Sequence, residues 1–499
     1  MSSFEFNKKL QQARYFIQLN QHGNALEVYA QLTKEFPQHG FLWDEYGRAA
    51  AAAGDYDLAG QIWDKSLDLE PRSAAVLLRI AGEYGKIWQF ARARALSRQA
   101  ADLEPDNLGT QLNLASLLTR SGGTDEARAA VNRCLDLDPQ HEQARCFAAH
   151  LSRRENKLDE AEQQFRDLLA TNPRDPHAAH FCHSELARIF DRTERFDDAM
   201  LYLREAKKLA SRSLNLDQAR KIFDDRRERM VRKARALPKS ILESWRTSFP
   251  VSVREPAPPL VFLGGHARSG TTLLERILDA HPSVAACDES LAFMTIGPLI
   301  DVTLPEIPVA RLNFARHRYL RNLTKVLESP ADGKLLVDKN PAVTPYLPAF
   351  LRAFPELRVL IALRDPRDVL VSCFFEDIVQ ITHLSFSNLA ELYSCVMDVW
   401  LAVREWSGLD WLQTRYEDIV VDLQKEGRRV TEFLGLDWQE NQARFHDQNR
   451  EKPVMSTANY HNITKPVYAR SVGRWRAYER YHAPVLPTLE PYCKEFGYA

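Results

Sequence analysis

A long apolar run, a signal-like N-terminus and a Cys-x-x-Cys pair are missing from this chain of 499 residues, and each absence argues against one class of protein. No apolar run approaches the about 18 residues that a helix needs to cross a bilayer, so we expect no membrane span. The N-terminus, MSSFEFNKK, has neither the apolar core nor the small-residue cleavage site of a secretory signal. The seven cysteines are odd in number and form no Cys-x-x-Cys pair, so we expect reduced thiols in a cytoplasmic protein.

Net charge is also scarce. The 66 Lys and Arg residues nearly balance the 67 Asp and Glu residues, which gives a formal charge of -1. This balance argues against nucleic-acid binding that is driven by overall charge, so we expect no nucleic-acid partner. It leaves room for a local basic pocket.

One segment has the spacing of a phosphate-binding loop but lacks the lysine of that loop. Residues 261–274, VFLGGHARSGTTLL, combine a buried strand, a glycine loop and the start of an amphipathic helix. The spacing of Gly265 and Gly270 matches the phosphate loop of nucleotide triphosphatases, but Thr271 stands where that loop has its lysine. Backbone N–H groups at a helix start attract anions, and Arg268 supplies a full positive charge. We therefore predict a site for a phosphate-like group without a metal ion; the alternative is a turn that only joins strand to helix.

The N-terminal two-fifths is repetitive. Prolines recur every 34 residues, and small residues follow the same period in two further series. The prolines are Pro37, Pro71, Pro105, Pro139 and Pro173, and the more regular small series is Ala25, Ala59, Ala93, Ala127 and Ala161. After Pro173 the spacing stretches by four residues, which predicts a longer loop or helix near residues 175–177.

Residues 5–210 resemble tetratricopeptide repeats, in which each unit is an antiparallel pair of helices and the units stack into a solenoid. The resemblance implies a groove that docks a protein or peptide partner; the alternative is a dimerisation or packing module. We predict a repeat domain over residues 1–215, a charged helical linker and proline-rich hinge over residues 216–257, and a second domain over residues 258–499.

The C-terminal half alternates short apolar runs with helical patterns, which predicts an α/β domain with a parallel sheet. The expected strands are residues 260–263, 335–337 and 359–363. Arg268, Lys339 and Arg364 follow these strands, and ligands of parallel sheets gather at the carboxyl ends of the strands. We therefore expect the three cations to converge on one polyanion.

Several segments of this half resemble sulfotransferases, and among those the tyrosylprotein group. Residues 268–273, RSGTTL, are similar to the loop that binds the 5'-phosphosulfate, and residues 364–372, RDPRDVLVS, to the segment that binds the 3'-phosphate. Residues 278–282, the acidic pair Asp288-Glu289, and the tail segments 456–467 and 473–475 are similar as well. The whole chain resembles bacterial fusions of tetratricopeptide repeats with such a domain. The resemblance implies sulfuryl transfer from 3'-phosphoadenylyl sulfate (PAPS) to an acceptor hydroxyl.

The resemblance also implies roles for individual residues. The residues that would bind PAPS are Arg268, Ser269, Gly270, Thr271, Thr272, Arg364, Ser372, Tyr416 and Arg474. Glu289 would be the catalytic base, with Lys339 and Ser456 stabilising the transition state and Arg268 assisting. Pro341 occupies the place where cytosolic small-molecule sulfotransferases have a histidine, which favours Glu289 as the base. The alternatives are a solvated carboxylate at a helix cap for Glu289, a surface ion pair for Lys339 and a structural role for Ser456.

Some positions depart from the tyrosylprotein pattern. Ala267 replaces a proline, Glu376 stands where a cofactor-binding arginine is expected, and residues 290–293 are SLAF rather than basic. The cofactor chemistry is therefore the better supported part, and the acceptor stays open between tyrosine, saccharide, lipid and small molecule. Two other functions remain as alternatives: a repeat scaffold on a catalytically lapsed transferase, and a nucleotide kinase or triphosphatase.

Overall fold

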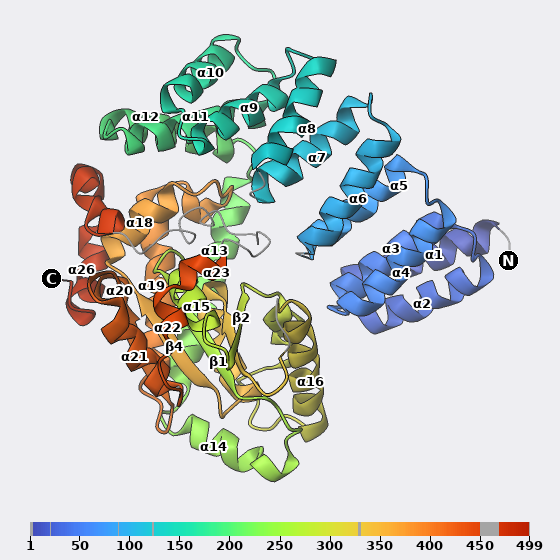
Figure 1. The fold of residues 1–499 in the computed structure, drawn as a ribbon. Coiled ribbons are helices and arrows are strands. Elements are labelled where there is room, and N and C mark those ends of the chain that lie inside the picture. The colour runs from blue at the N-terminus through green and yellow to red at the C-terminus, as the bar shows by residue number, and fades with distance from the viewer. Residues whose placement is uncertain are drawn as a thin grey trace. The chain divides into compact units, whose positions relative to one another are not determined.

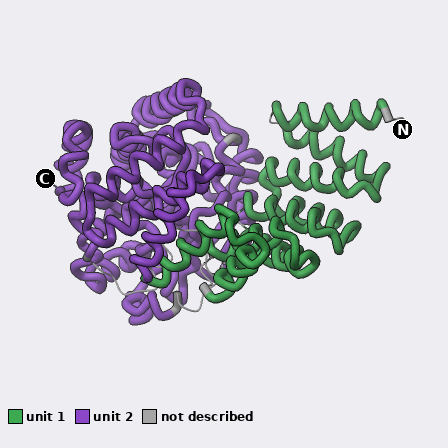
Figure 2. Tube along the Cα trace, turned by 90° about the horizontal axis from the view of Figure 1, so that it is seen from above, with its two compact units in different colours: residues 1–156, 454–458 green, residues 157–453, 459–499 purple. Residues whose placement is uncertain are grey.

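The computed structural model of the protein describes residues 3–19, 21–87, 89–121, 124–327, 331–449 and 469–498. Within these residues the chain forms two compact units; the first ends at Asn156 and the second begins at Lys157 (Figure 2). The boundary that we predicted at residue 215 therefore does not coincide with the boundary between the units. The end of the repeat region packs with the α/β domain.

The first unit consists of helix pairs at the predicted 34-residue period. Successive helices pack against each other because small residues let them approach closely: Ala25, Ala59, Ala93 and Ala127 are completely buried. A Cβ atom on Gly47 would lie 2.2 Å from Nε1 of Trp63, so only glycine fits between α3 and α4. The helices of this unit are α1 (Ser3–Gln18), α2 (His22–Glu35), α3 (Gly40–Ala52), α4 (Tyr56–Leu69), α5 (Ala74–Lys86), α6 (Phe90–Leu103), α7 (Leu108–Ser121), α8 (Thr124–Leu137) and α9 (Glu142–Arg154).

The second unit begins with five more helices, α10 (Leu158–Ala170), α11 (Pro176–Arg192), α12 (Phe196–Ser211), α13 (Leu216–Ala236) and α14 (Ile241–Ser248). The stretched spacing after Pro173 is a longer helix, because α11 has 17 residues where α9 has 13. Helix α13 does not run as a free linker. It packs along α19 (Phe386–Val403), where Arg220 bonds Glu391 at 2.6 Å and Arg235 bonds Asp398 at 2.9 Å.

A parallel five-stranded sheet in the order β2-β3-β1-β4-β5 forms the centre of the second unit (Figure 1). The strands are β1 (Leu260–Gly265), β2 (Val284–Asp288), β3 (Leu335–Lys339), β4 (Arg358–Leu363) and β5 (Trp411–Arg415). The three strands predicted from apolar runs are confirmed. The two outer strands were missed because β2 is built of weak strand formers, Ala285 and Ala286, and β5 carries Gln413 and Arg415.

Alternating side chains of the strands point to opposite faces of the sheet, and both faces are covered by packed side chains. Val261 and Leu263 of β1 pack with Ile277 of α15 (Thr271–Asp279) and Val430 of α21 (Leu423–Phe433). Phe262 points to the opposite face and meets Phe350, at 5.5 Å between ring centroids.

The other elements are α16 (Val309–Lys325), η4 (Pro341–Tyr346), α17 (Leu347–Ala353), α18 (Pro366–Phe374), α20 (Tyr416–Val421), α22 (Glu440–Ala443), α23 (Phe445–Asn449), η6 (Ala469–Ser471), η7 (Arg474–Tyr478), α25 (Glu479–His482) and α26 (Leu486–Glu495), with short 3-10 turns η1 (Val251–Val253), η2 (Ala292–Thr295), η3 (Gly297–Leu299) and η5 (Ile381–His383).

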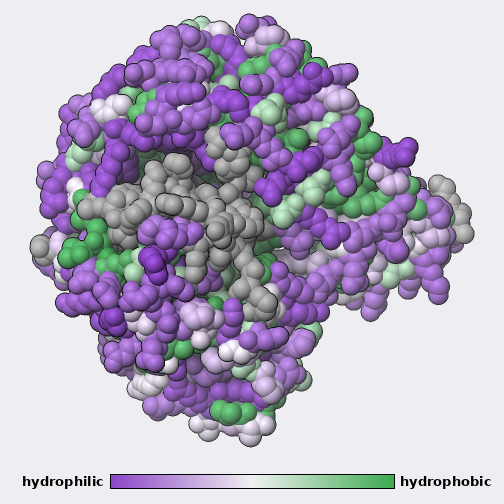
Figure 3. All heavy atoms as spheres, in the orientation of Figure 1, coloured by the Kyte–Doolittle hydropathy of each residue, from purple (hydrophilic) through white to green (hydrophobic). Residues whose placement is uncertain are grey.

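The described helices include none that is long and apolar enough to cross a membrane. Hydrophilic side chains dominate the face drawn in Figure 3, with only scattered apolar ones. All seven cysteines are buried and unpaired, as the absence of a Cys-x-x-Cys pattern led us to expect.

The stability of the second unit should depend on the residue at which a shortened chain begins. A chain starting at Lys157 should unfold in one cooperative transition, because it retains the whole compact unit. A chain starting at Thr247 loses α10 to α13 and most of α14 and exposes their partners, so its Tm should fall by about 5 °C or more relative to the 157–499 chain. Calorimetry of both chains measures the difference. Equal Tm values would show that these helices contribute nothing to the stability of the unit.

Candidate functional site

Two left-handed residues shape the loop between β1 and α15. Arg268 has a φ of 71° and Gly270 a φ of 86°, and Leu274 N–H already bonds the Gly270 carbonyl at 3.1 Å. A Cβ atom on Gly270 would lie 2.7 Å from Cδ2 of Tyr416, so glycine is needed for the ring of Tyr416 to pack on the loop. The N–H groups of the first turn of α15 have no partner within the helix, which makes this end suited to an anion.

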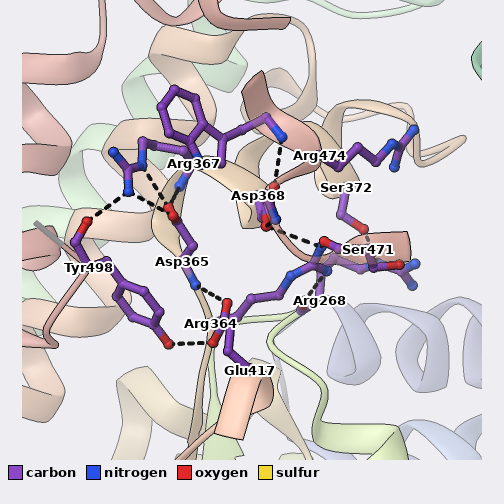
Figure 4. Close-up of polar contacts among 12 residues, drawn as sticks. Arg268, Arg364, Asp365, Arg367, Asp368, Ser372, Glu417, Ser471, Arg474 and Tyr498 are labelled. Atoms are coloured by element: carbon purple, nitrogen blue, oxygen red, sulfur yellow. Dashed lines mark hydrogen bonds and ion pairs between the residues drawn. The ribbon is translucent and has the colours of Figure 1, made fainter. Parts of the chain in front are cut away.

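Arg268 connects this loop to α18. Its Nε donates to Oγ of Ser372 at 3.0 Å (Figure 4). Its Nη2 lies 3.4 Å from Oε1 of Glu376. Ser372 lies in α18, which begins just after β4. The structure therefore brings together two residues that are 104 positions apart in the sequence and that were both predicted to bind PAPS.

Arg364 lies behind the same loop and is only 7% exposed. Its Nη1 donates to the Arg268 carbonyl at 3.3 Å, and its Nη2 donates to the Ser471 carbonyl (Figure 4). Its guanidinium lies 5.0 Å from the Tyr416 ring. Its Nε is buried and donates to no group among the described residues. Together with Ser372 and Tyr416, it forms a cationic cluster beside the start of α15.

A second charged cluster lies at the ends of β2 and β3. Lys339 is completely buried and pairs with Asp288 and with Glu289, whose Oε1 is 3.0 Å from Nζ. Burial opposes the charge of Lys339, but the neighbouring carboxylates outweigh it and raise its pKa above the usual value. The Glu289 side chain is 33% exposed and that of Asp288 only 2%. Glu289 is therefore the carboxylate of this pair that an incoming group can reach.

The backbone fixes the direction of Glu289. It has a φ of 52°, and its N–H donates to the Lys339 carbonyl at 2.7 Å. Glu289 follows β2 directly, so it is not part of a helix cap, and Lys339 is not a surface ion pair. Both structural alternatives that the sequence left open are thus wrong.

Comparison with protein families agrees with this geometry. Residues 259–440 match a model described as the sulfotransferase family. Residues 10–74, 89–151 and 148–213 match models of tetratricopeptide repeats. The chain carries tetratricopeptide repeats followed by a sulfotransferase family domain.

Individual relatives are distant. An uncharacterised protein of Aquifex aeolicus is 26% identical over 61% of this chain and 40% of its own length. Protein-tyrosine sulfotransferase A of Caenorhabditis elegans is 26% identical over 44% of this chain and 61% of its own. Protein-tyrosine sulfotransferase 1 of Danio rerio is 25% identical over 44% and 65%. The matches thus span 40–65% of the length of these relatives, and the sulfotransferase domain is distantly related to protein-tyrosine sulfotransferases.

The remaining predicted residues of the sulfotransferase domain lie as follows. Ser269, Thr271 and Thr272 are buried in the loop and the first turn of α15. Arg474 does not join the cluster of Arg364; its Nε and Nη2 bond Asp191 of α11 at 3.0 and 2.8 Å. Ser456 lies outside the described residues.

Two histidines lie near the loop, and neither is well placed to act as the base. Burial lowers the pKa of His266 to about 4, and its Nδ1 lies 2.8 Å from the Ala267 carbonyl. His281 accepts from Ser283 N–H at 3.0 Å and closes the turn before β2. Neither is exposed enough to meet an acceptor, so Glu289 remains the better candidate for the base.

Sequence reasoning assigned no role to the carboxylates that support the site. Asp288, Glu275 and Asp338 are each at most 6% exposed, and Asp338 accepts from Tyr319 Oη at 2.7 Å. The signal for two of them was present, since Asp288 and Asp338 stand at the ends of β2 and β3 beside predicted site residues. Glu275 gave no signal, because it falls in an amphipathic helix where a carboxylate is ordinarily exposed.

Replacing Glu275 by glutamine should show that this carboxyl group is neutral in the folded protein. Burial is the main cause that raises the pKa of Glu275 from its usual 4.5 to about 8. The folded state then holds a proton that the unfolded state releases, so the stability from this group is full below pH 4.5 and is lost as pH rises through 8. Glu275→Gln does not titrate. Its free energy of unfolding should match that of the natural protein near pH 5 and exceed it increasingly towards pH 8.

Urea unfolding at pH 5, 6.5 and 8 measures this difference. The exposed Glu432, replaced by glutamine, serves as the control and should show a difference that does not change with pH. A Glu275→Gln difference that is constant or shrinks with rising pH would contradict a neutral, buried Glu275.

Proposed function

We propose that the second unit transfers a sulfuryl group from PAPS to an acceptor hydroxyl. The observation that supports this most is the combination of two anion-binding elements at one loop: the start of α15, and the cluster of Arg268, Arg364 and Ser372. A nucleotide with a phosphate-like group at both the 5' and 3' positions suits such a pair. A nucleoside triphosphate has all its phosphates on one side.

The residues present fit this nucleotide. The loop N–H groups, Ser269, Thr271 and Thr272 would hold the 5'-phosphosulfate, and Arg364 with Ser372 would hold the 3'-phosphate. The buried Nε of Arg364 has no acceptor among the residues that the structure describes, which supports this assignment, since an unsatisfied buried donor costs about 1–3 kcal/mol. Tyr416 would contribute its ring, which lies against both Gly270 and Arg364.

Glu289 accepts the acceptor's proton in this proposal. When bound, PAPS supplies the sulfuryl group and a phosphate that leaves. The acceptor oxygen forms its bond to sulfur as the bond from sulfur to the bridging oxygen breaks, and the hydroxyl proton passes to Glu289. The products are a sulfate ester and adenosine 3',5'-bisphosphate.

Lys339 balances the charge of this step. Its Nζ lies 3.0 Å from Oε1 of Glu289, the atom that would take the proton. The ammonium group of Lys339 can then donate to the leaving oxygen, while Asp288 keeps it in place. Ser456 is assigned the same stabilising role, and Arg268 is assigned to the charge on the transferring group.

The first unit would dock the acceptor or a partner. Tetratricopeptide arrays commonly bind peptides on their inner face, and docking raises the effective concentration of a large acceptor. The acceptor need not resemble an acidic tyrosine segment, because Ala292 and Phe293, which follow Glu289, are buried and apolar. An acceptor hydroxyl of protein, saccharide or small molecule is compatible with the site; transfer of labelled sulfur from PAPS in a host extract would identify it.

Adenosine 3',5'-bisphosphate should bind much more tightly than AMP, because Arg364 and Ser372 serve the 3'-phosphate. A hydrogen bond to a charged group contributes about 1.5–3 kcal/mol, so Arg364→Ala should reduce this preference by roughly tenfold or more. Isothermal titration calorimetry of both nucleotides measures it, and EDTA should leave the affinities unchanged.

Arg429→Ala, an exposed arginine of α21, is the matched control and should keep the full preference. Equal affinity of the natural protein for the two nucleotides would overturn the proposed function. Hydrolysis of ATP that depends on Mg2+ would favour a triphosphatase instead.

Glu289→Gln should reduce turnover by about 10²–10⁴-fold and leave nucleotide affinity unchanged, because the amide keeps the shape but cannot take a proton. The rate on the acceptor found by sulfur labelling measures this effect. Glu432→Gln, at an exposed position, should retain the full rate. A full rate for Glu289→Gln would show that the base is another residue.

A further inference from the structure

One face of α11 is directed at the sulfotransferase domain. His180, Ser184, Arg188 and Asp191 follow one another at intervals of four, four and three residues, so they form a single stripe on the helix. Each bonds a group between residues 375 and 478, although α11 belongs by sequence to the last tetratricopeptide repeat.

The last repeat caps the C-terminus of α18, the helix that carries Ser372. Arg188 Nη2 donates to the Phe375 carbonyl at 2.9 Å, and Lys207 Nζ of α12 donates to the Glu376 carbonyl at 2.6 Å. These carbonyls follow the last turn of α18, where a helix leaves acceptors unpaired and favours cations. Asp377 is held in the same way, by Ser184 Oγ at 3.2 Å and His180 Nε2 at 3.2 Å.

The same repeat holds the segment with Arg474. Asp191 bonds Arg474 and also accepts from Tyr478 Oη at 2.8 Å. The guanidinium of Arg474 lies 4.4 Å from the centroid of the Phe375 ring, and Phe375 is the residue that Arg188 holds. The two segments that α11 binds are therefore in contact with each other.

Both segments are connected to the nucleotide cluster. Glu376 pairs with Arg268, and Ser372 accepts from Arg268 one turn earlier in α18. Asp368, in the first turn of α18, accepts from the N–H groups of Gly473 and Trp475, each at 2.7 Å (Figure 4). A displacement of α11 or α12 would thus be transmitted to Ser372 and Arg268.

Several of these contacts are made by charged side chains that are buried. Lys207 is 5% exposed and Glu185, which pairs with Arg188, is 1% exposed. Buried charges contribute little to stability relative to apolar packing of the same size, but they do fix geometry. An interface that served only as support would not need them.

We propose that Arg188, Asp191 and Lys207 of the last repeat are positioning residues for the 3'-phosphate site. They hold the end of α18 and the segment of Arg474 so that Ser372 stays beside Arg364 at the 3'-phosphate. The proposal rests on the proposed function and goes beyond it, because it makes part of the repeat region a component of nucleotide recognition.

Lys207→Met and Asp191→Asn test this in the full chain. Both remove a charge while keeping the size of the side chain. The affinity for adenosine 3',5'-bisphosphate should fall by about three- to tenfold, since part of a charge-assisted contact is lost. The affinity for adenosine 5'-phosphosulfate, which has no 3'-phosphate, should stay within about twofold of the natural protein. Lys207→Arg should restore the loss because it returns the cation.

The controls are Lys208→Met and Asp198→Asn, whose side chains are 63% and 45% exposed on α12. Both should bind the two nucleotides as the natural protein does. Equal losses for both nucleotides in Lys207→Met, or no loss at all, would overturn the positioning role while leaving the proposed function intact. Failure of the natural protein to prefer the bisphosphate would overturn both proposals.

Discussion

The side chain and backbone of Arg268 join the parts of the candidate site. Its left-handed backbone turns the loop into α15, its carbonyl accepts from Arg364, and its guanidinium reaches Ser372 and Glu376. These contacts draw β1, β4 and α18 to one point, although the residues lie up to 108 positions apart. In a nucleotide triphosphatase the lysine of the loop serves its phosphates. Here Thr271 stands at that position, and the positive charge of the loop comes from Arg268, which is itself held by protein groups.

The charges of the domain are divided between two neighbouring strand ends. The cluster around Arg268 and Arg364 is cationic and suits a nucleotide, while Lys339 is surrounded by Asp288, Glu289 and Glu275. Burial raises the pKa of Glu275 to about 8, and of these three carboxyl groups only that of Glu289 is accessible. The parallel sheet places both clusters at its carboxyl edge.

The sequence predicted those parts whose signal is local. The 34-residue period located the repeats, the glycines Gly265 and Gly270 located the loop between β1 and α15, and apolar runs located the three central strands. The outer strands were missed because Ala285, Ala286 and Gln413 have weak strand propensity. The division between compact units at residue 156 was not predicted, because nothing in α11 distinguishes it from other repeats except its length. Asp191 and Arg474 meet across 283 residues, and a single sequence contains no signal for such a contact.

The two proposals meet at α18, whose last turn binds Arg268 on one side and the last repeat on the other. A crystal structure of the full chain with adenosine 3',5'-bisphosphate tests the central claim most directly. The account predicts the 5'-phosphate on the N–H groups that begin α15, and the 3'-phosphate in contact with both Arg364 and Ser372. A nucleotide bound elsewhere, or a 3'-phosphate that contacts neither residue, would contradict it.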